Sequence, residues 1–462
     1  MRLFPGTLLG LACLAAFSTP AALRAADGDL DASFVGGTKR VLFGADNAAA
    51  TELEPLADGR LLVGGTVEDP PRWVVRKVWE SGAIDIGWSA SSPPFDFSGE
   101  TMSIAGGLYD LWRDPADVLE RTMMLGAVEI SSGDFRPGLA RLTSSGALDA
   151  AFDGNGVKIL SAAPAGWTEL FVNDGKFFAD GSSVFVGSCL HCPTADVRRT
   201  FVARFLASGA PDTGFSGDGW IALSAGLESD NSGSAVTVDA QGRIVVACRV
   251  AGFLFSEAYV ARLTASGSFD GSFGGGDGMT DSHIVGSLPR VTDVTTDPSS
   301  GRIAVAYRLS AAYPLEGAVE VLTAAGLEDN TFSGDGHIDL DLEEGSSVDS
   351  VAFQSDGKLL AVGNIDANGV QTGGFFLARM TKSGALDASF DGNGVKRVEF
   401  DAADDVDDGA QVVTTWSGRL VAAGYAGAGG GDPQAFAILR TENTGIFADG
   451  FESGSTAGWA GY

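Results

Sequence analysis

The chain has 462 residues, of which 60 are acidic and 30 are basic, so its formal net charge at pH 7 is −30. A surface of this sign repels phosphate backbones and anionic lipid, which argues against nucleic acid and membrane surfaces as partners. Hydrophobic residues make up 45% of the chain, enough to bury a large core, which argues against intrinsic disorder.

The N-terminus, MRLFPGTLLGLACLAAFSTPAALRAADG, has the three parts of a secretory signal. Arg2 supplies the positive start, Leu8 to Phe17 the apolar run, and small residues near Ala25 a cleavage site. The run is shorter than the roughly 20 residues that span a bilayer, so we expect no transmembrane segment. We predict that 1–25 is a signal peptide and that the mature protein is secreted, periplasmic or on the outer cell surface. A lipoprotein signal using Cys13 is the alternative.

Three cysteines remain after the signal, and two of them are close together in Cys189-Leu-His-Cys192. This spacing suits a local disulfide in an oxidising compartment, which is the pairing that we predict. Metal binding or redox chemistry is the alternative, but no second pair or nearby histidine completes a tetrahedral site. Cys248 lies in an apolar run and is expected to be buried.

An acidic, glycine-rich phrase recurs along the chain. It reads GALDAAFDGNGVKIL from Gly146 and GALDASFDGNGVKRVEF from Gly384, and degraded copies occur between and before them. The aromatic residues that anchor these copies are about 60 residues apart: Phe34, Trp88, Phe152, Phe215, Phe273, Phe332 and Phe390. A fixed period of this length indicates a repeat architecture.

Each repeat contains further motifs that predict short strands. A turn followed by an apolar run recurs in chain order at 57–65, 121–129, 179–188, 240–248, 299–307, 355–363 and 416–424. Each of these is followed by a segment of the form Ala-Arg-Leu, then by the next copy of the phrase. Alternating runs such as HIDLDL and VKRVEF follow the phrase, and Asp-Gly turns suit hairpins. Four strands in each unit predict an all-β fold, a β-propeller of seven four-stranded blades.

The ends of the chain predict how the ring closes. The last unit supplies only three strands, whereas the chain begins with one, at 38–43. We expect this N-terminal strand to pair with 436–441 and complete the last blade, which removes the exposed sheet edges. The predicted domains are therefore a propeller at 27–445 and a C-terminal tail at 446–462.

The combination of LDxSFxGxG with a following DGKLLAVG resembles the bacterial delta-60 repeat proteins. The resemblance extends from about Gly28 to Arg440, and the unit between Trp88 and Phe152 departs from the pattern. The resemblance implies a β-propeller without an assigned activity. The tail IFADGFESGSTAGW resembles a segment shared by otherwise different exported bacterial proteins.

Calcium is a possible ligand of the acidic turns. In the phrase, Asp391 and Asn393 supply too few oxygens for an ion that takes six to eight, so we interpret them as turn caps. The acidic stretch DAADDVDDG is the better calcium candidate, with Asp404, Asp405, Asp407 and Asp408, although a solvated acidic loop is the simpler interpretation. We expect no other cofactor.

No catalytic motif surrounds the three histidines, His191, His283 and His337. Catalysis by carboxylates alone, as in a carbohydrate-active hydrolase or lyase, stays open as the alternative. We expect instead a binding or structural protein whose partner is an extracellular protein or glycan. Convergent carboxylates in a pocket would favour an enzyme, and an exposed aromatic patch beside a bare channel would favour a binder.

The irregular segment GGLYDLWRDPADVLER, at 106–121, is the first candidate for ligand binding. It interrupts the weakest unit with Tyr109, Trp112 and Arg113, residue types that are common at recognition surfaces. The alternative is a loop or short helix that packs on its own blade.

Overall fold

The computed structural model describes residues 27–442 with internal gaps. The gaps are 28, 35–37, 42–46, 69, 91–94, 96, 98–103, 115, 132, 161–162, 193–197, 224–229, 252–255, 285–288, 310–315, 341, 343–344, 366–373, 399–406, 415–418 and 429–431. The predicted signal peptide at 1–25 and the predicted tail at 446–462 lie outside the described residues.

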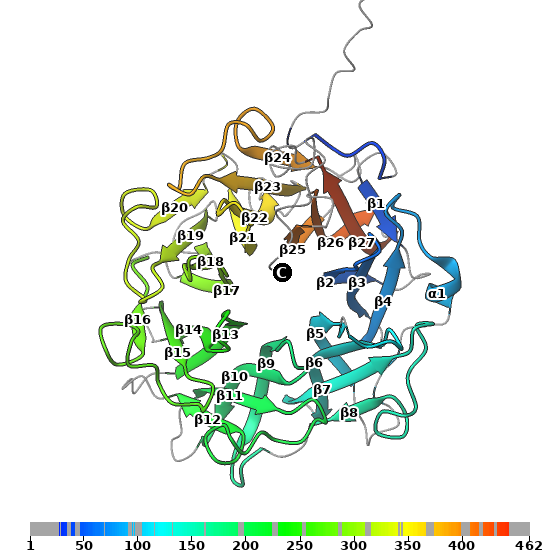
Figure 1. The fold of residues 1–462 in the computed structure, drawn as a ribbon, viewed down its shortest axis with the longest axis vertical. Coiled ribbons are helices and arrows are strands. Elements are labelled where there is room, and N and C mark those ends of the chain that lie inside the picture. The colour runs from blue at the N-terminus through cyan, green and yellow to red at the C-terminus, as the bar shows by residue number, and fades with distance from the viewer. Residues whose placement is uncertain are drawn as a thin grey trace, which may run out of the picture.

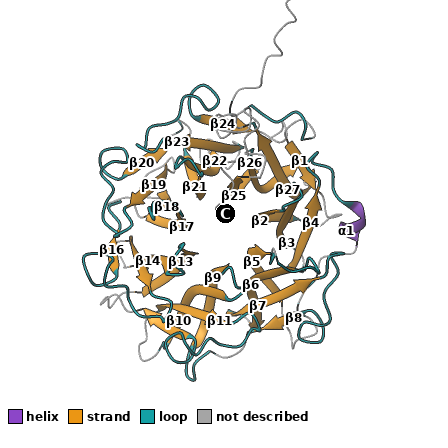
Figure 2. Ribbon diagram, in the orientation of Figure 1, coloured by secondary structure: helices purple, strands orange, loops and turns teal. Residues whose placement is uncertain are grey.

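Antiparallel sheets stand as seven blades around a common axis, which confirms the predicted propeller (Figures 1 and 2). Blades 1 to 3 contain β2 (Ala48–Pro55), β3 (Leu61–Val67) and β4 (Arg72–Val78); β5 (Ile104–Trp112), β6 (Thr122–Ser131), β7 (Asp134–Leu142) and β8 (Val157–Ile159); and β9 (Thr168–Phe177), β10 (Ser183–Leu190), β11 (Arg199–Phe205) and β12 (Trp220–Leu223).

Blades 4 to 6 follow the same order. They contain β13 (Asp230–Val238), β14 (Ile244–Ala251), β15 (Ser256–Leu263) and β16 (Met279–Asp281); β17 (Pro289–Thr296), β18 (Ile303–Leu309), β19 (Glu316–Leu322) and β20 (His337–Leu340); and β21 (Ser346–Phe353), β22 (Leu359–Ile365), β23 (Phe375–Met380) and β24 (Val395–Val398). Blade 7 contains β25 (Asp407–Thr414), β26 (Leu420–Ala428), β27 (Asp432–Thr441) and β1 (Thr38–Val41).

Blade 1 differs from the other six at its outer edge. Among the described residues its sheet has three strands, and the described part of the outer edge is an isolated bridge between Trp73 and Phe95, whose backbones exchange hydrogen bonds of 2.9 and 3.0 Å. The short helix α1 (Ile86–Ala90) lies in the connection between β4 and this bridge. The unit between Trp88 and Phe152, which departs from the repeat pattern, begins with this helix.

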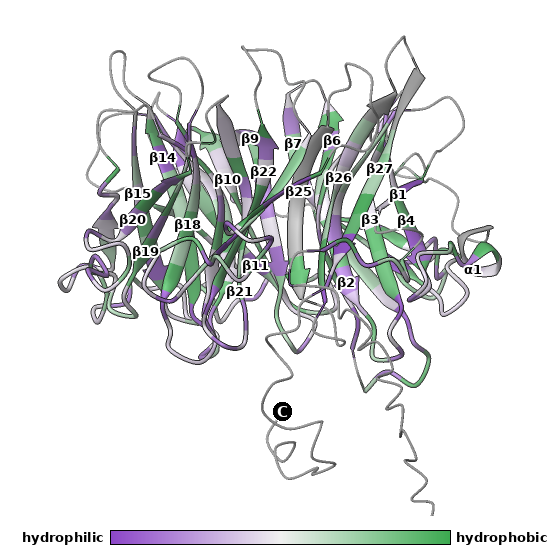
Figure 3. Cartoon of the chain, turned by 90° about the horizontal axis from the view of Figure 1, so that it is seen from above, coloured by the Kyte–Doolittle hydropathy of each residue, from purple (hydrophilic) through white to green (hydrophobic). Residues whose placement is uncertain are grey.

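The N-terminal strand closes the ring as predicted. β1 pairs antiparallel with β27, with Thr38 opposite Leu439 and Val41 opposite Phe436. Because the first strand of the chain is hydrogen-bonded to the last, the two ends of the chain hold one blade together. In the side view the strands run from one face of the ring to the other, and hydrophobic residues are concentrated along them (Figure 3).

The aromatic anchors of the repeat fill the spaces between blades. Phe390, for example, is fully buried in a cluster with Leu360 of blade 6 and Leu420 of blade 7. The other six anchors are also buried and lie in corresponding inter-blade clusters: Phe34, Trp88, Phe152, Phe215, Phe273 and Phe332. The repeated phrase therefore supplies the packing between neighbouring blades.

The acidic residues of the phrase are engaged in its own turn. Asp387 accepts hydrogen bonds from the Ser389 backbone at 3.1 Å and hydroxyl at 2.7 Å, and pairs with Arg379 at 2.8 Å. The Arg379 guanidinium lies over the ring of Phe390, at 4.9 Å from its centroid. Asn393 caps the backbone of Val395 at 2.9 Å. These contacts match the interpretation of the phrase as a structural turn.

Candidate functional site

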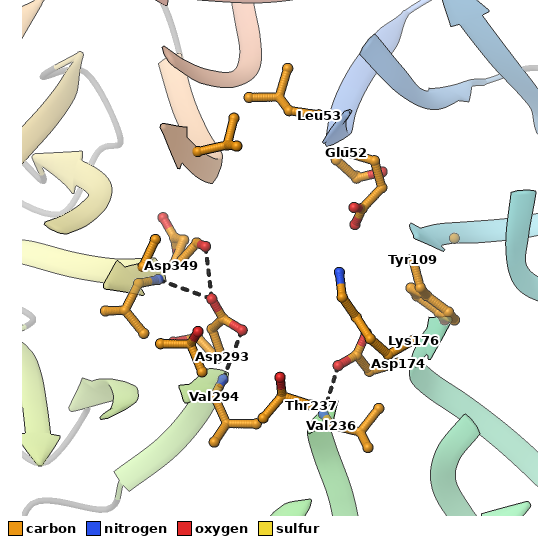
Figure 4. Close-up of a pocket in the computed structure, with 18 of the residues that line it drawn as sticks. Glu52, Leu53, Tyr109, Asp174, Lys176, Val236, Thr237, Asp293, Val294 and Asp349 are labelled. Carbon is orange, nitrogen blue, oxygen red and sulfur yellow. Dashed lines mark hydrogen bonds between the residues drawn. The ribbon is translucent and has the colours of Figure 1, made fainter. Parts of the chain in front are cut away.

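A cavity of about 490 Å³ lies in the centre of the ring. The innermost strand of every blade contributes to its wall: β2, β5, β9, β13, β17, β21 and β25 (Figures 1 and 4). We call this cavity the channel.

Each innermost strand has a β-bulge near its middle, where one residue has no partner on the second strand of the blade. The bulged residues are Thr51, Tyr109, Asn173, Ser234, Thr292, Asp349 and Ala410. A bulge bends the strand and changes the direction of nearby side chains. It can therefore turn polar groups toward the neighbouring blade or the channel.

Four bulged side chains donate a hydrogen bond to the next blade, each time to the carbonyl that precedes the bulge there. The pairs are Thr51 to Leu108 at 2.9 Å, Tyr109 to Val172 at 2.7 Å, Asn173 to Gly233 at 2.8 Å and Thr292 to Val348 at 2.7 Å. We call this set the inter-blade ring. Its members are committed to holding the blades together.

Carboxylates that follow the bulges extend the same connection. Asp174 accepts from the backbone of Val236 in the next blade at 2.7 Å, and Asp293 accepts in the same way from Val351 at 2.9 Å (Figure 4). Burial raises the pKa of Asp174 to about 8, although the backbone donors oppose the rise. Burial also raises the pKa of Asp293.

Lys176 is the cation of the channel wall. Its Nζ lies 2.7 Å from Asp110 Oδ1, and the other oxygen of Asp110 accepts from the backbone of Phe177 at 2.8 Å. Burial opposes the charge of Lys176, but the carboxylates of Asp110, Glu52 and Asp174 outweigh it and hold its pKa above the ordinary value. This ammonium is therefore charged and already paired.

In six of the seven blades, the residue three positions after the bulge lies in the channel wall, and we call these six residues the channel-facing set. It comprises Glu54, Lys176, Thr237, Thr295, Ala352 and Val413. In blade 2 the corresponding residue, Trp112, packs against Phe177 instead. In the part of the chain that the structure describes, the Glu54 carboxyl and the hydroxyls of Thr237 and Thr295 make no side-chain hydrogen bond. Unlike the inter-blade ring, these groups are free to meet a ligand.

Glu54 has the most unusual electrostatic surroundings of this set. Burial raises its pKa to about 7, and the nearby Asp110 adds to the rise, whereas Lys176 and Arg113 oppose it. A carboxyl with this pKa can exchange a proton at neutral pH. It can also accept a hydrogen bond from a ligand.

The structure separates the three residues predicted to form a ligand surface. Tyr109 lies in the channel wall as part of the inter-blade ring, while Trp112 packs against Phe177, with 5.9 Å between ring centroids. Arg113 pairs with Glu120 at 3.0 Å. The segment 106–121 is not an insertion over its first half, because 104–112 forms β5, the innermost strand of blade 2. A ligand role for the three residues stays a prediction.

The predicted cysteine pair lies at the end of blade 3. Cys189 and Cys192 are joined as a disulfide, and both side chains are buried. Cys248 is a buried free thiol whose pKa is raised to about 12 by burial. A thiol of this kind is neutral and unreactive at physiological pH.

The acidic calcium candidate is only partly described. Asp404 and Asp405 lie outside the described residues, and Asp407 and Asp408 begin β25. Among the residues that the structure does describe, no group of three or more His, Cys, Asp or Glu side chains is arranged to hold a metal ion. Calcium binding at these aspartates stays a prediction.

The three histidines are distributed over different strands and turns. His191 follows β10, His337 begins β20, and His283 follows β16 and contacts the buried Glu320 at 2.8 Å. Glu320 also accepts from the hydroxyl of Tyr307 at 2.8 Å. These contacts hold blade 4 against blade 5.

The channel-facing set was missed from the sequence, although a signal for it exists. Five of its six members lie five positions before the glycine of the following turn, as Glu54 lies before Gly59. The exception is Thr295, which lies six positions before Gly301 because that turn is one residue longer. Aligning the repeats on the turn glycine would have placed these residues at one level of the ring.

Residues 354–390 match the family model of a β-propeller domain of unknown function (DUF5122). This match covers one repeat and supports a β-propeller family. No curated protein matches the chain. Of the described residues, none belongs to a helix that is long and apolar enough to cross a membrane.

Several solved structures are similar in shape. One is Sqt1 from Chaetomium thermophilum, with 12% identity, a TM-score of 0.49 and coverage of 90% of this chain and 98% of that one. Another is an inactive variant of virginiamycin B lyase from Staphylococcus aureus, with 7% identity, a TM-score of 0.44 and coverage of 87% and 98%. The polysaccharide lyase Uly1 has 11% identity, a TM-score of 0.43 and coverage of 85% and 90%. Nothing about activity follows from similarities this low.

Proposed function

We propose that this protein is an exported β-propeller that binds a small polar ligand in its channel. The observation that carries the proposal is that some polar side chains of the channel wall contact the next blade, whereas others do not. The inter-blade ring and its carboxylates hold the blades together, whereas Glu54, Thr237 and Thr295 of the channel-facing set offer polar groups that make no contact between blades.

The dimensions and chemistry of the channel suit a small ligand. Ligand pockets in proteins enclose roughly 300–1,000 Å³ and combine apolar surface with a few polar groups that fix orientation. The channel has about 490 Å³, and its channel-facing set supplies a carboxyl, an ammonium, two hydroxyls and the apolar side chains of Ala352 and Val413. A small polar molecule, or the terminal sugar of an extracellular glycan chain, would fit in a channel of this volume.

A thermal-shift screen with a blocked variant tests the proposal. The panel contains monosaccharides, amino sugars, uronates, amino acids and polyamines. We expect at least one compound to raise the melting temperature of the wild type but not of Val413→Trp, which fills the channel. Val118→Trp is the matched control, since Val118 is 92% exposed. The proposal fails if no compound binds, or if every binder also stabilises the blocked variant.

A carboxylate-dependent carbohydrate-active enzyme is the second candidate. The channel brings carboxylates together, and Glu54 has a pKa of about 7, which suits a general acid or base. Binding is preferred because glycoside hydrolysis ordinarily needs two available carboxyls, and Asp110, Asp174 and Asp293 already accept hydrogen bonds from the frame. Release of sugar from an oligosaccharide, lost in Glu54→Gln, would favour the enzyme.

Two finer assignments belong to the same proposal. We assign the repeats to the delta-60 kind, because both halves of that motif recur at a period of about 60 residues. We assign export to the N-terminal segment, because its charge, apolar run and small residues are those of a signal peptide. N-terminal sequencing of the protein recovered from the culture medium or periplasm should start near Ala26, and a retained Met1 would contradict export.

A further inference from the structure

We infer that the channel ligand carries an amine together with hydroxyl groups, as an amino sugar does, and that its ammonium is bound by Glu54. This inference rests on the proposed function, because it specifies the ligand of the same cavity.

Carboxyl groups outnumber cations in the channel wall. The wall contains one ammonium, Lys176, and five carboxyls, which are Glu52, Glu54, Asp174, Asp293 and Asp349. Two ion pairs already use charges at the wall, since Lys176 binds Asp110 at 2.7 Å and Arg308 binds Asp349 at 2.8 Å. An added anion would therefore meet carboxyls and a cation that is occupied, whereas an added cation would meet the unpaired carboxyl of Glu54.

The low dielectric of a cavity strengthens this preference. Charges that interact weakly in water interact several times more strongly where water is partly excluded. Glu54 is half-buried in the channel wall, and this burial is the main cause of its raised pKa. A bound ammonium would lower this pKa again, so binding of an amine near pH 7 is accompanied by release of a proton from Glu54.

The positions of the hydroxyls define the rest of the ligand. Glu54 belongs to blade 1, and Thr237 and Thr295 belong to blades 4 and 5, which stand across a seven-bladed ring from blade 1 (Figures 1 and 4). Between them, blades 6 and 7 present Ala352 and Val413. The wall thus offers an anion at one side, hydroxyls at the opposite side and apolar contact between them.

Three sugars with one ring shape and different charges test the inference. We propose calorimetric titration with D-glucosamine, D-glucose and D-glucuronate at low ionic strength and pH 6.5, where the amine of glucosamine is charged and Glu54 is mostly protonated. We expect glucosamine to bind about tenfold or more tightly than glucose, and glucuronate to bind most weakly. Glucosamine binding should release protons, seen as a dependence of the measured heat on the ionisation enthalpy of the buffer.

Variants separate the role of Glu54 from that of the cavity. Glu54→Gln should reduce the affinity for glucosamine to that for glucose, while the exposed Glu80→Gln should leave it unchanged. Val413→Trp should abolish binding of both sugars. A melting curve for each variant shows whether it is folded, and the comparison with glucose within one variant does not depend on its stability.

Each result supports the inference, overturns it or removes the proposed function. If glucose or glucuronate binds more tightly than glucosamine, and Val413→Trp abolishes this binding, the inference is overturned. The channel then remains a ligand site. Binding of only a neutral or anionic member of the wider panel overturns it as well. If no compound is found whose binding Val413→Trp abolishes, the proposed function itself is wrong.

Discussion

At the scale of single residues, the side chains of the repeated acidic phrase stabilise the packing between blades. In the phrase, Asp387 caps a turn and pairs with Arg379, whose guanidinium covers the ring of Phe390. Cation and aromatic ring attract each other in this arrangement. The phrase and the arginine of the preceding Ala-Arg-Leu strand therefore stabilise each other, which explains why both recur together in successive units.

Phe390 should be among the residues on which stability depends most. Phe390→Ala removes a fully buried ring between two blades and should lower the free energy of unfolding by about 3–5 kcal/mol. Leu386→Ala, in the same phrase, is the control because Leu386 is 37% exposed. Urea denaturation of both variants measures the difference. Equal effects of the two substitutions would contradict the role of Phe390 as an inter-blade anchor.

Glu54 should make the stability of the protein depend on pH. Its folded-state pKa of about 7 lies above the ordinary value of 4.5, so the folded protein keeps a proton that the unfolded chain releases between these values. Stability contributed by the protonated group is therefore lost as pH rises through this window.

Glu54→Gln, which stays neutral, should resemble the wild type near pH 5 and exceed its free energy of unfolding by up to about 3 kcal/mol at pH 8. Urea denaturation at the two pH values measures this, and Glu80→Gln serves as the exposed control. A difference between wild type and Glu54→Gln that is the same at both pH values would show that Glu54 titrates normally.

At the scale of elements, the bulged innermost strands distinguish structural from available side chains. Thr292 and Thr295 illustrate this on β17. The hydroxyl of Thr292 donates to Val348 of the next blade, whereas that of Thr295 faces the channel without a side-chain hydrogen bond among the described residues. The same strand thus carries one threonine that belongs to the inter-blade ring and one that is available to a ligand.

Substitution of these two threonines by valine should give opposite results. Thr292→Val should lower the free energy of unfolding by about 1 kcal/mol, because a buried carbonyl loses its donor. Thr295→Val should leave stability nearly unchanged but weaken binding of a ligand that carries hydroxyls. Chemical denaturation and calorimetry measure the two properties. A larger loss of stability for Thr295→Val than for Thr292→Val would show that Thr295 holds the blades together instead.

At the scale of the whole molecule, β1 holds the ring closed. β1 pairs with β27, and the segment before β1 supplies Asp31, which pairs with Arg440 at 2.7 Å. A chain that starts at residue 45 should therefore melt at a much lower temperature than one that starts at residue 27, and it should aggregate through the exposed edge of β27. Equal melting temperatures and solubility would show that closure contributes little.

Much of the architecture could be predicted from the sequence, because it depends on local patterns. The spacing of anchors such as Phe332 and Phe390 indicated seven units, and the missing strand of the last unit indicated closure by β1. The outer edge of blade 1 was less predictable, because its described residues form the helix α1 and a single bridge at Phe95.

The channel could not be predicted in the same way. Its wall collects residues from seven distant segments, and which side chains face it depends on the bulges. A bulge shifts the alternation of a strand by one residue, so simple periodicity assigns the wrong face. In β5 the register shifts twice, at 105–108 and 108–110, which is why the segment containing Tyr109 resembled an insertion.

The most direct test of the channel as a ligand site is a crystal structure of the protein soaked with the tightest compound of the panel. We predict that the ligand lies within the channel and contacts Glu54 on one side and Thr237 or Thr295 on the other. A ligand bound on the outer surface of the ring, or a channel that contains only water at saturating ligand, would contradict the account.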